Sequence, residues 1–234
     1  MKDKNIIRVK ESIKIVEQRL RGIETVAHID QHRAYGGIIR SAKGKLLEEF
    51  CIFLVKIAWD ELGGREEDIS FPTKKIPIPL RKDYIRRITS TEIRKWIEDN
   101  YDEFVFWAQV DVHVFIRDQF VLGIECKSYT ENAMLKRILV DFSLLKTKYP
   151  KLKCALLQLE SQLTGDYSQI HNAVIYGSRS THTLMSYFDI DLNIMTLLDG
   201  ERRVDEPIHL PEYYKPLEFP IVESVISKIE TLLQ

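Results

Sequence analysis

Two alternating apolar stretches joined by a short polar segment constrain this chain more than any other feature. Apolar residues occupy every second position of residues 110–116 and again of residues 120–126, with polar residues at 117–119 between them. A period of two is typical of β-strands whose two faces differ. A three-residue turn at 117–119 pairs the apolar positions with one another and places Val112 opposite Ile124. The sequence therefore predicts an antiparallel hairpin with one wholly apolar face.

The same register gathers charged residues on the other face, at the open end of the hairpin. Asp111 falls opposite Glu125, and Lys127 follows two positions later on the same face. Directly opposed residues lie about 5 Å apart, and like charges there destabilise a sheet unless something offsets them. A divalent cation with oxygen ligands would do so, and the alternative is a surface ion pair on a half-exposed sheet. A two-residue turn would instead place Asp111 opposite Cys126.

A further acidic residue belongs to a helix predicted over residues 42–62. At 100° per residue, Glu48 falls within the apolar arc that contains Cys51 and Val55, whereas Glu49 falls in the polar stripe. A glutamate turned toward a core needs a partner or a metal ion. The alternative is a boundary residue whose carboxylate reaches water.

The remaining patterns indicate an α/β chain with a mixed sheet. Further helices are predicted at 5–21, 91–100, 131–148, 181–188 and 221–233, strands at 154–159 and 192–198, and an extended proline-rich passage at 71–79. Gly36 and Gly37 predict a break before the 42–62 helix, with Ser41 as its N-cap. We expect one domain over 1–234, with a core at about 41–200, an N-terminal helical segment at 1–40 and a C-terminal helix at 221–233.

Charge and composition give weaker guidance. The formal net charge is −1, which is not typical of a nucleic-acid binder, but basic residues concentrate in 73–95 and 136–153. Such segments could neutralise phosphates, or they could be ordinary solvated surface. The three cysteines lie scattered in apolar runs, as buried free thiols do, and no apolar stretch has the length of a signal peptide or membrane span. We therefore expect a cytoplasmic protein.

The order of these features resembles the PD-(D/E)XK nuclease superfamily, which includes most type II restriction endonucleases. The resemblance rests on Gly44 and Glu48 in one helix, on Val110-Asp111 in one strand, and on residues 124–127 (Ile-Glu-Cys-Lys) in the next. A helix and the apolar strand 154–159 follow, as in the αβββαβ core of that superfamily. The resemblance covers residues 41–160 and departs from the usual pattern at Val110, where proline is common. It implies a restriction-endonuclease-like fold with a mixed central sheet flanked by helices.

The resemblance also implies roles for individual residues. Asp111, Glu125 and the backbone carbonyl of Cys126 would bind Mg²⁺, with Mn²⁺ as a substitute, and Lys127 would orient the attacking water. Glu48 would support a second metal ion or the water network. The implied activity is sequence-specific hydrolysis of double-stranded DNA by a homodimer, leaving a 5′-phosphate and a 3′-hydroxyl. The alternatives are a repair or junction-resolving nuclease of the same fold, or a non-catalytic DNA-binding module with a vestigial site.

Contacts with DNA are expected from polar and basic residues beside the site and in the basic segments. For each of them ordinary surface chemistry is the alternative. The candidates are Ser128, Tyr129, Lys74, Lys75, Arg81, Lys82, Arg86, Arg87, Arg94 and Arg179.

Overall fold

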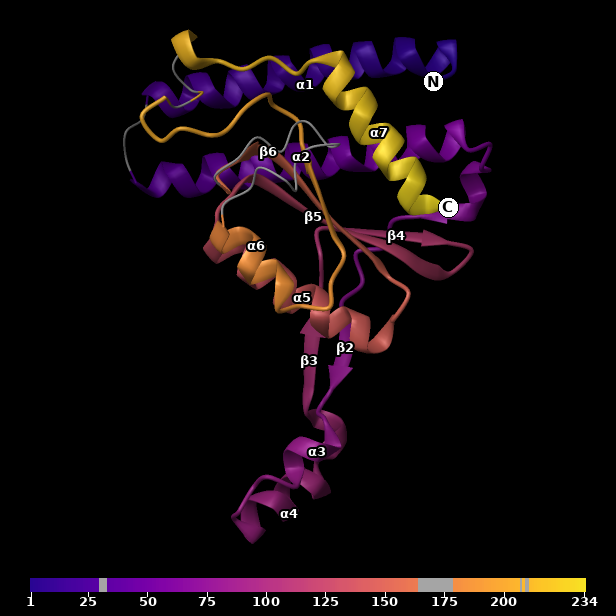
Figure 1. The fold of residues 1–234 in the computed structure, drawn as a ribbon, viewed down its shortest axis with the longest axis vertical. Helices are drawn as coiled ribbons and strands as arrows, with labels where there is room; N and C mark the ends of the chain where they lie inside the picture. The colour runs from indigo at the N-terminus through magenta and orange to yellow at the C-terminus, as the bar shows by residue number, and fades with distance from the viewer. Residues whose placement is uncertain (30–32, 164–178, 207, 209–210) are drawn as a thin grey trace.

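A five-stranded mixed sheet forms the centre of the molecule in the computed structural model, which describes residues 1–29, 33–163, 179–206, 208 and 211–234 (Figure 1). The strands lie in the order β1-β4-β5-β6-β7; β1, β4 and β5 are antiparallel, and β5, β6 and β7 are parallel. Their bounds are β1 (Ile69–Ser70), β4 (Val112–Ile116), β5 (Gln119–Thr130), β6 (Lys153–Ser161) and β7 (Leu192–Thr196).

Helices cover both faces of this sheet. Residues of α1 (Asp3–Ile29), α2 (Arg33–Glu61) and α7 (Phe219–Leu233) form one core with Leu122, Ile124 and Cys126 of β5. The opposite face packs against α5 (Asn132–Lys148) and α6 (Arg179–Ser186). Short 3₁₀ turns occur at η1 (Glu66–Asp68), η2 (Tyr101–Glu103) and η3 (Pro211–Tyr213). The predicted class is confirmed, because α2, β1, β4, β5, α5 and β6 reproduce the αβββαβ order.

Two local expectations were wrong. The predicted break at Gly36-Gly37 is absent, because α2 begins at Arg33 and continues through both glycines and Ser41. Two glycines cost a helix only about 1 kcal/mol each relative to alanine, and the long apolar face of α2 is buried against the sheet.

None of the described helices is long and apolar enough to cross a membrane.

The hairpin turn also differs from the expected three-residue form. It contains two residues, Arg117 and Asp118, both with positive φ (47° and 66°), as a type I′ turn requires. A register shift between Val114 and Phe115 then compensates for the shorter turn. The predicted pairing of Val112 with Ile124 is therefore confirmed, although the turn that was to produce it was not.

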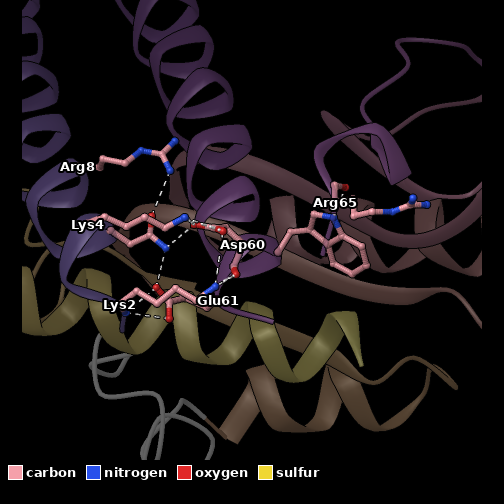
Figure 2. Close-up of polar contacts among 8 residues, drawn as sticks. Lys2, Lys4, Arg8, Asp60, Glu61 and Arg65 are labelled. Carbon is pink, nitrogen blue, oxygen red and sulfur yellow. Dashed lines mark hydrogen bonds and ion pairs between the residues drawn. The ribbon is translucent and has the colours of Figure 1, made fainter. Parts of the chain in front are cut away.

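The start of α1 is bonded to the end of α2 by a polar network (Figure 2). The fully buried Asn5 donates to Asp60 at 2.9 Å and to Glu61 at 2.7 Å. Lys4 lies 2.9 Å from the Asp60 carboxylate, and Lys2 lies 3.6 Å from it. The hydrogen bonds from Lys4 and Asn5 lower the pKa of Asp60 to about 2. This network connects the N-terminal helix to the helix that covers the sheet.

A long arm is inserted between β1 and β4 and projects from the body (Figure 1). Its stem is a two-stranded antiparallel ribbon of β2 (Ile76–Pro79) and β3 (Val105–Ala108), which packs against α5. Its tip carries α3 (Lys82–Ile85) and α4 (Thr91–Asp99). Ser90 caps α4, since its hydroxyl accepts a hydrogen bond from the Ile93 N–H at 3.3 Å.

Candidate active site

Lys127 lies between Asp111 and Glu125, the two acidic residues that the sequence predicted beside it. Its ammonium group is 2.6 Å from Glu125 Oε1 and 2.9 Å from Asp111 Oδ2, and it donates to the Cys126 carbonyl at 3.2 Å. The Cys126 N–H donates to the same Asp111 oxygen at 2.8 Å. The hairpin thus places an aspartate, a glutamate and a lysine within bonding distance, as the register predicted.

Each side chain is held by a different piece of local structure. Glu125 and Lys127 are two apart on β5 and share the face that packs against α5, where Glu125 lies beside Leu156 of β6. Asp111 directly precedes β4. The buried His113 accepts a hydrogen bond from the Val110 N–H at 3.2 Å, which fixes the backbone one residue before Asp111. His113 therefore supports the site through the backbone.

Burial and neighbouring charges shift the ionisation of the site. The Glu125 side chain is only 13% exposed; burial and then the nearby Asp111 charge raise its pKa, against the lowering effect of Lys127. The pKa of Lys127 is also raised: burial lowers it, but the two carboxylates outweigh that effect. Lys127 is therefore an ammonium ion at neutral pH.

Glu48 lies at the edge of this group. It is half-buried on α2, and burial followed by the charge of Asp111 raises its pKa, so the carboxylate is within electrostatic range of the site. Its neighbour Glu49 is exposed and forms an ion pair with Arg19 at 3.2 Å. The different environments predicted for these two glutamates are confirmed, while the role of Glu48 stays a prediction.

Sequence reasoning missed Asp141 on α5. Burial raises the pKa of this carboxylate, and it interacts electrostatically with Glu125 and Lys127. A signal was available, because Asp141 lies three residues after Ile138 and four before Leu145, at the edge of the buried stripe of α5. The site thus faces a further acidic group from the covering helix.

The oxygen donors around Lys127 fit a hard divalent cation. The three atoms that contact the ammonium are two carboxylate oxygens and one backbone carbonyl, which are the donor types that Mg²⁺ prefers. Among the residues that the structure describes, no three His, Cys, Asp or Glu side chains converge closely enough to hold a metal ion. Two carboxylates and a carbonyl, rather than three acidic side chains, are therefore the set that fits.

The residues predicted to contact DNA occupy four regions. Ser128 and Tyr129 follow the lysine on β5, and the Tyr129 ring lies 4.2 Å from the guanidinium carbon of Arg202. Lys74 and Lys75 precede the arm, and Arg179 is the exposed first residue of α6. The other candidates belong to the arm: Arg81, Lys82, Arg86, Arg87 and Arg94.

Several of the arm residues already have partners within the chain. Arg81 and Arg87 contact Asp83 at 2.7 and 3.4 Å. Arg94 donates to the Ile88 carbonyl at 2.6 and 3.2 Å. These three guanidinium groups therefore stabilise the arm itself.

Comparison with known proteins identifies the family. No family model matches the chain. The type II restriction enzyme DdeI from Desulfomicrobium norvegicum is 52% identical over 206 residues, which cover 87% of this chain and 85% of that protein. A solved structure, described as the native BbvCI A2B2 tetramer at low resolution, aligns over 99% of this chain and 92% of its own with 11% identity; its TM-score of 0.36 is too low to support an argument. On the strength of the extensive sequence identity, the chain belongs to the type II restriction enzymes.

Proposed function

We propose that this restriction enzyme hydrolyses phosphodiester bonds of double-stranded DNA at a specific sequence, with Mg²⁺ as cofactor. Family membership supports the reaction class, since the DdeI relative is a type II restriction enzyme. The observation that carries the chemistry is the set of three oxygen atoms around Lys127, which supplies ligands for a divalent ion. The proposed products carry a 5′-phosphate and a 3′-hydroxyl.

The side chains divide the work. A bound divalent ion supplies positive charge to the phosphoryl oxygens and lowers the pKa of an attacking water. Asp111 is fixed for ligation by the Cys126 N–H, and Glu125 by its position two residues from the lysine on β5. Lys127, which the carboxylates keep protonated, donates hydrogen bonds that orient the water and stabilise developing negative charge. Glu48, with its carboxylate near Asp111, supports the water network or a second ion.

DNA contact is proposed for the polar and basic residues predicted from the sequence. In the described part of the chain, Lys82 and Arg86 make no ion pair, so they are better placed to contact phosphates than Arg81, Arg87 and Arg94. Cutting both strands of a symmetric target requires two sites, which supports a homodimer. The three free, buried cysteines, Cys51, Cys126 and Cys154, support the cytoplasm as the compartment.

The test is cleavage of phage DNA by variants of the site. Asp111→Ala and Lys127→Ala are expected to abolish Mg²⁺-dependent cleavage while duplex binding persists, because they remove ligation and orientation without changing the basic residues proposed to contact DNA. Asp118→Asn, in the exposed hairpin turn, is the control: it removes a carboxylate charge, keeps a residue that tolerates positive φ, and should cut normally. Cleavage retained by either site variant would refute the catalytic assignment.

The same assay separates the alternatives. Discrete fragments with one common end sequence support a restriction activity, whereas smearing or cutting confined to branched DNA supports a repair or junction-resolving nuclease. A non-catalytic module predicts intact DNA together with no heat on titration with Mn²⁺ or Ca²⁺. Of these outcomes we expect discrete fragments.

A further inference from the structure

The arm exposes far more apolar surface than its length warrants. Five of the eleven large apolar side chains that are exposed in the described residues lie between Tyr84 and Trp107, and each of the five is more than half exposed. They are Tyr84, Ile93, Trp96, Phe106 and Trp107. Apolar side chains that cluster on a projecting element mark an interaction surface rather than scattered surface variation.

Two complementary features make up this surface. The first is a mainly apolar groove of about 1140 Å³ at the base of the arm, lined by residues 77–81, Tyr84, residues 103–106, and Leu144, Thr147 and Lys148 of α5. The second is the exposed face of α4, where Ile93 and Trp96 are one helical turn apart and 53% and 59% exposed. Trp96 is oriented by Phe104, whose ring meets it edge-on at 5.3 Å. A short amphipathic helix and an apolar groove are the two halves of a helix-in-groove contact.

The β2 edge of the ribbon is unsuited to strand addition. Pro77 and Pro79 lie on β2, one of the two open edges of the ribbon, and neither has an N–H to donate. Prolines on an edge strand hinder another strand from extending the ribbon on that side. The groove is lined mainly by apolar side chains, which suit the apolar face of a helix.

The charges beside this apolar surface favour a second copy of this chain as its occupant. Residues 81–95 carry six basic and two acidic residues, whereas residues 98–103 carry four acidic residues and no basic one. The acidic segment would repel phosphates, and Arg81, Arg87 and Arg94 already bond within the arm. A twofold axis between two antiparallel arms places the basic segment of each copy against the acidic segment of the other.

We infer that the arm is the dimerisation element: α4 of each copy inserts Ile93 and Trp96 into the groove at the base of the other copy's arm. The contact is isologous, so each copy contributes one helix and one groove. It rests on the proposed function in so far as cutting two strands requires two active sites. Its exposed aromatic side chains, Tyr84, Trp96, Phe106 and Trp107, are of the kind enriched in specific protein interfaces.

Sedimentation velocity of the full chain, without DNA or metal, tests this inference. The wild type is expected to be dimeric. Ile93→Lys and Phe106→Glu each place a charge in the contact, and each should weaken the dimer by about 30-fold or more, as for an interface hot spot. The double variant pairs the new lysine with the new glutamate and should recover most of the dimer. Ile7→Lys, at a side chain that is 60% exposed on α1, is the control and should remain dimeric.

Each result has a definite meaning. A wild type that is monomeric at all concentrations, or single variants that remain as dimeric as Ile7→Lys, would overturn the inference. Single variants that stay dimeric but lose duplex binding would assign the arm to DNA instead. A double variant as monomeric as the single ones would refute the pairing of α4 with the groove. Circular dichroism confirms folding, and Ile93→Thr carries the same prediction with a smaller effect if the charged variant unfolds.

This experiment is independent of the nuclease proposal. A protein that is dimeric through its arms but cuts no DNA would refute the proposed function and leave the arm contact standing. A metal-dependent nuclease that is monomeric would do the reverse.

Discussion

Replacing Lys127 with methionine tests whether the lysine occupies the position of a cation. Methionine keeps an unbranched side chain of similar length but has no charge. The ammonium now lies 2.6 Å from Glu125 and 2.9 Å from Asp111, whose side chains are 13% and 27% exposed. Without it, two neighbouring carboxylates face each other with no compensating charge. We expect the metal-free variant to be less stable than the wild type.

The size of the effect follows from this exposure. Breaking a fully buried pair costs about 3–5 kcal/mol and an exposed one less than about 1 kcal/mol, so a partly buried pair of this kind contributes about 2 kcal/mol. For a chain of this size that corresponds to a fall in Tm of roughly 4–8 °C. A divalent ion should then stabilise the variant more than the wild type, because the ammonium no longer competes for the same oxygens; saturation at 100 times the Kd contributes about 2.7 kcal/mol.

Thermal unfolding in EDTA and in saturating Ca²⁺ measures both effects. Lys14→Met, at an exposed lysine of α1, is the control and should unfold like the wild type in either condition. The reasoning is refuted if Lys127→Met is as stable as the wild type in EDTA and gains no more from Ca²⁺. That outcome would mean that the two carboxylates need no cation between them.

Three further predictions concern single residues. The pKa of Asp60 is about 2 in the folded chain and 3.8 ordinarily, so its ionised form stabilises the fold above pH 4. That contribution to stability is lost as the pH falls toward 2. In acid unfolding followed by circular dichroism, Asp60→Asn should therefore lose less stability than the wild type. A Cβ at Gly123 would lie 3.0 Å from the Phe142 ring, so Gly123→Ala should lower the free energy of unfolding in urea by about 1–3 kcal/mol. An unchanged urea midpoint would show that α5 shifts to accommodate the methyl group without loss of stability. Glu48→Gln should slow cleavage by about 10-fold or more, because a group that supports a metal site is lost. Glu49→Gln should cut at the wild-type rate. Equal cleavage rates in the two variants would exclude Glu48 from the site.

The sequence was a good guide to the site because one pattern determined several residues at once. Alternation of apolar residues selected the pairing of Val112 with Ile124, and the positions of Asp111, Glu125 and Lys127 followed from it. The turn itself was wrong because periodicity does not reveal a bulge, which adds a residue to one strand without changing the apolar pattern beyond it. The register was thus better determined than the loop that closes it.

Other features depended on contacts that a single sequence does not reveal. Glycine propensity predicted a break at Gly36-Gly37, but packing along the rest of α2 outweighs it. The charges of residues 73–95 suggested a surface patch, and their organisation into a projecting arm depends on the ribbon formed by Ile76–Pro79 and Val105–Ala108, two segments separated by 25 residues. Asp141 was missed because its proximity to Glu125 arises only from the packing of α5 on the sheet.

The connection between the arm and the hairpin has a mechanical consequence. Only Gln109 and Val110 separate the last residue of β3 from Asp111, and Val110 is both buried and hydrogen-bonded to His113. A linker of two residues has little freedom to bend, so a displacement of the arm's stem also moves the Asp111 carboxylate. Whatever engages the arm therefore also helps to set the position of Asp111, the proposed metal ligand.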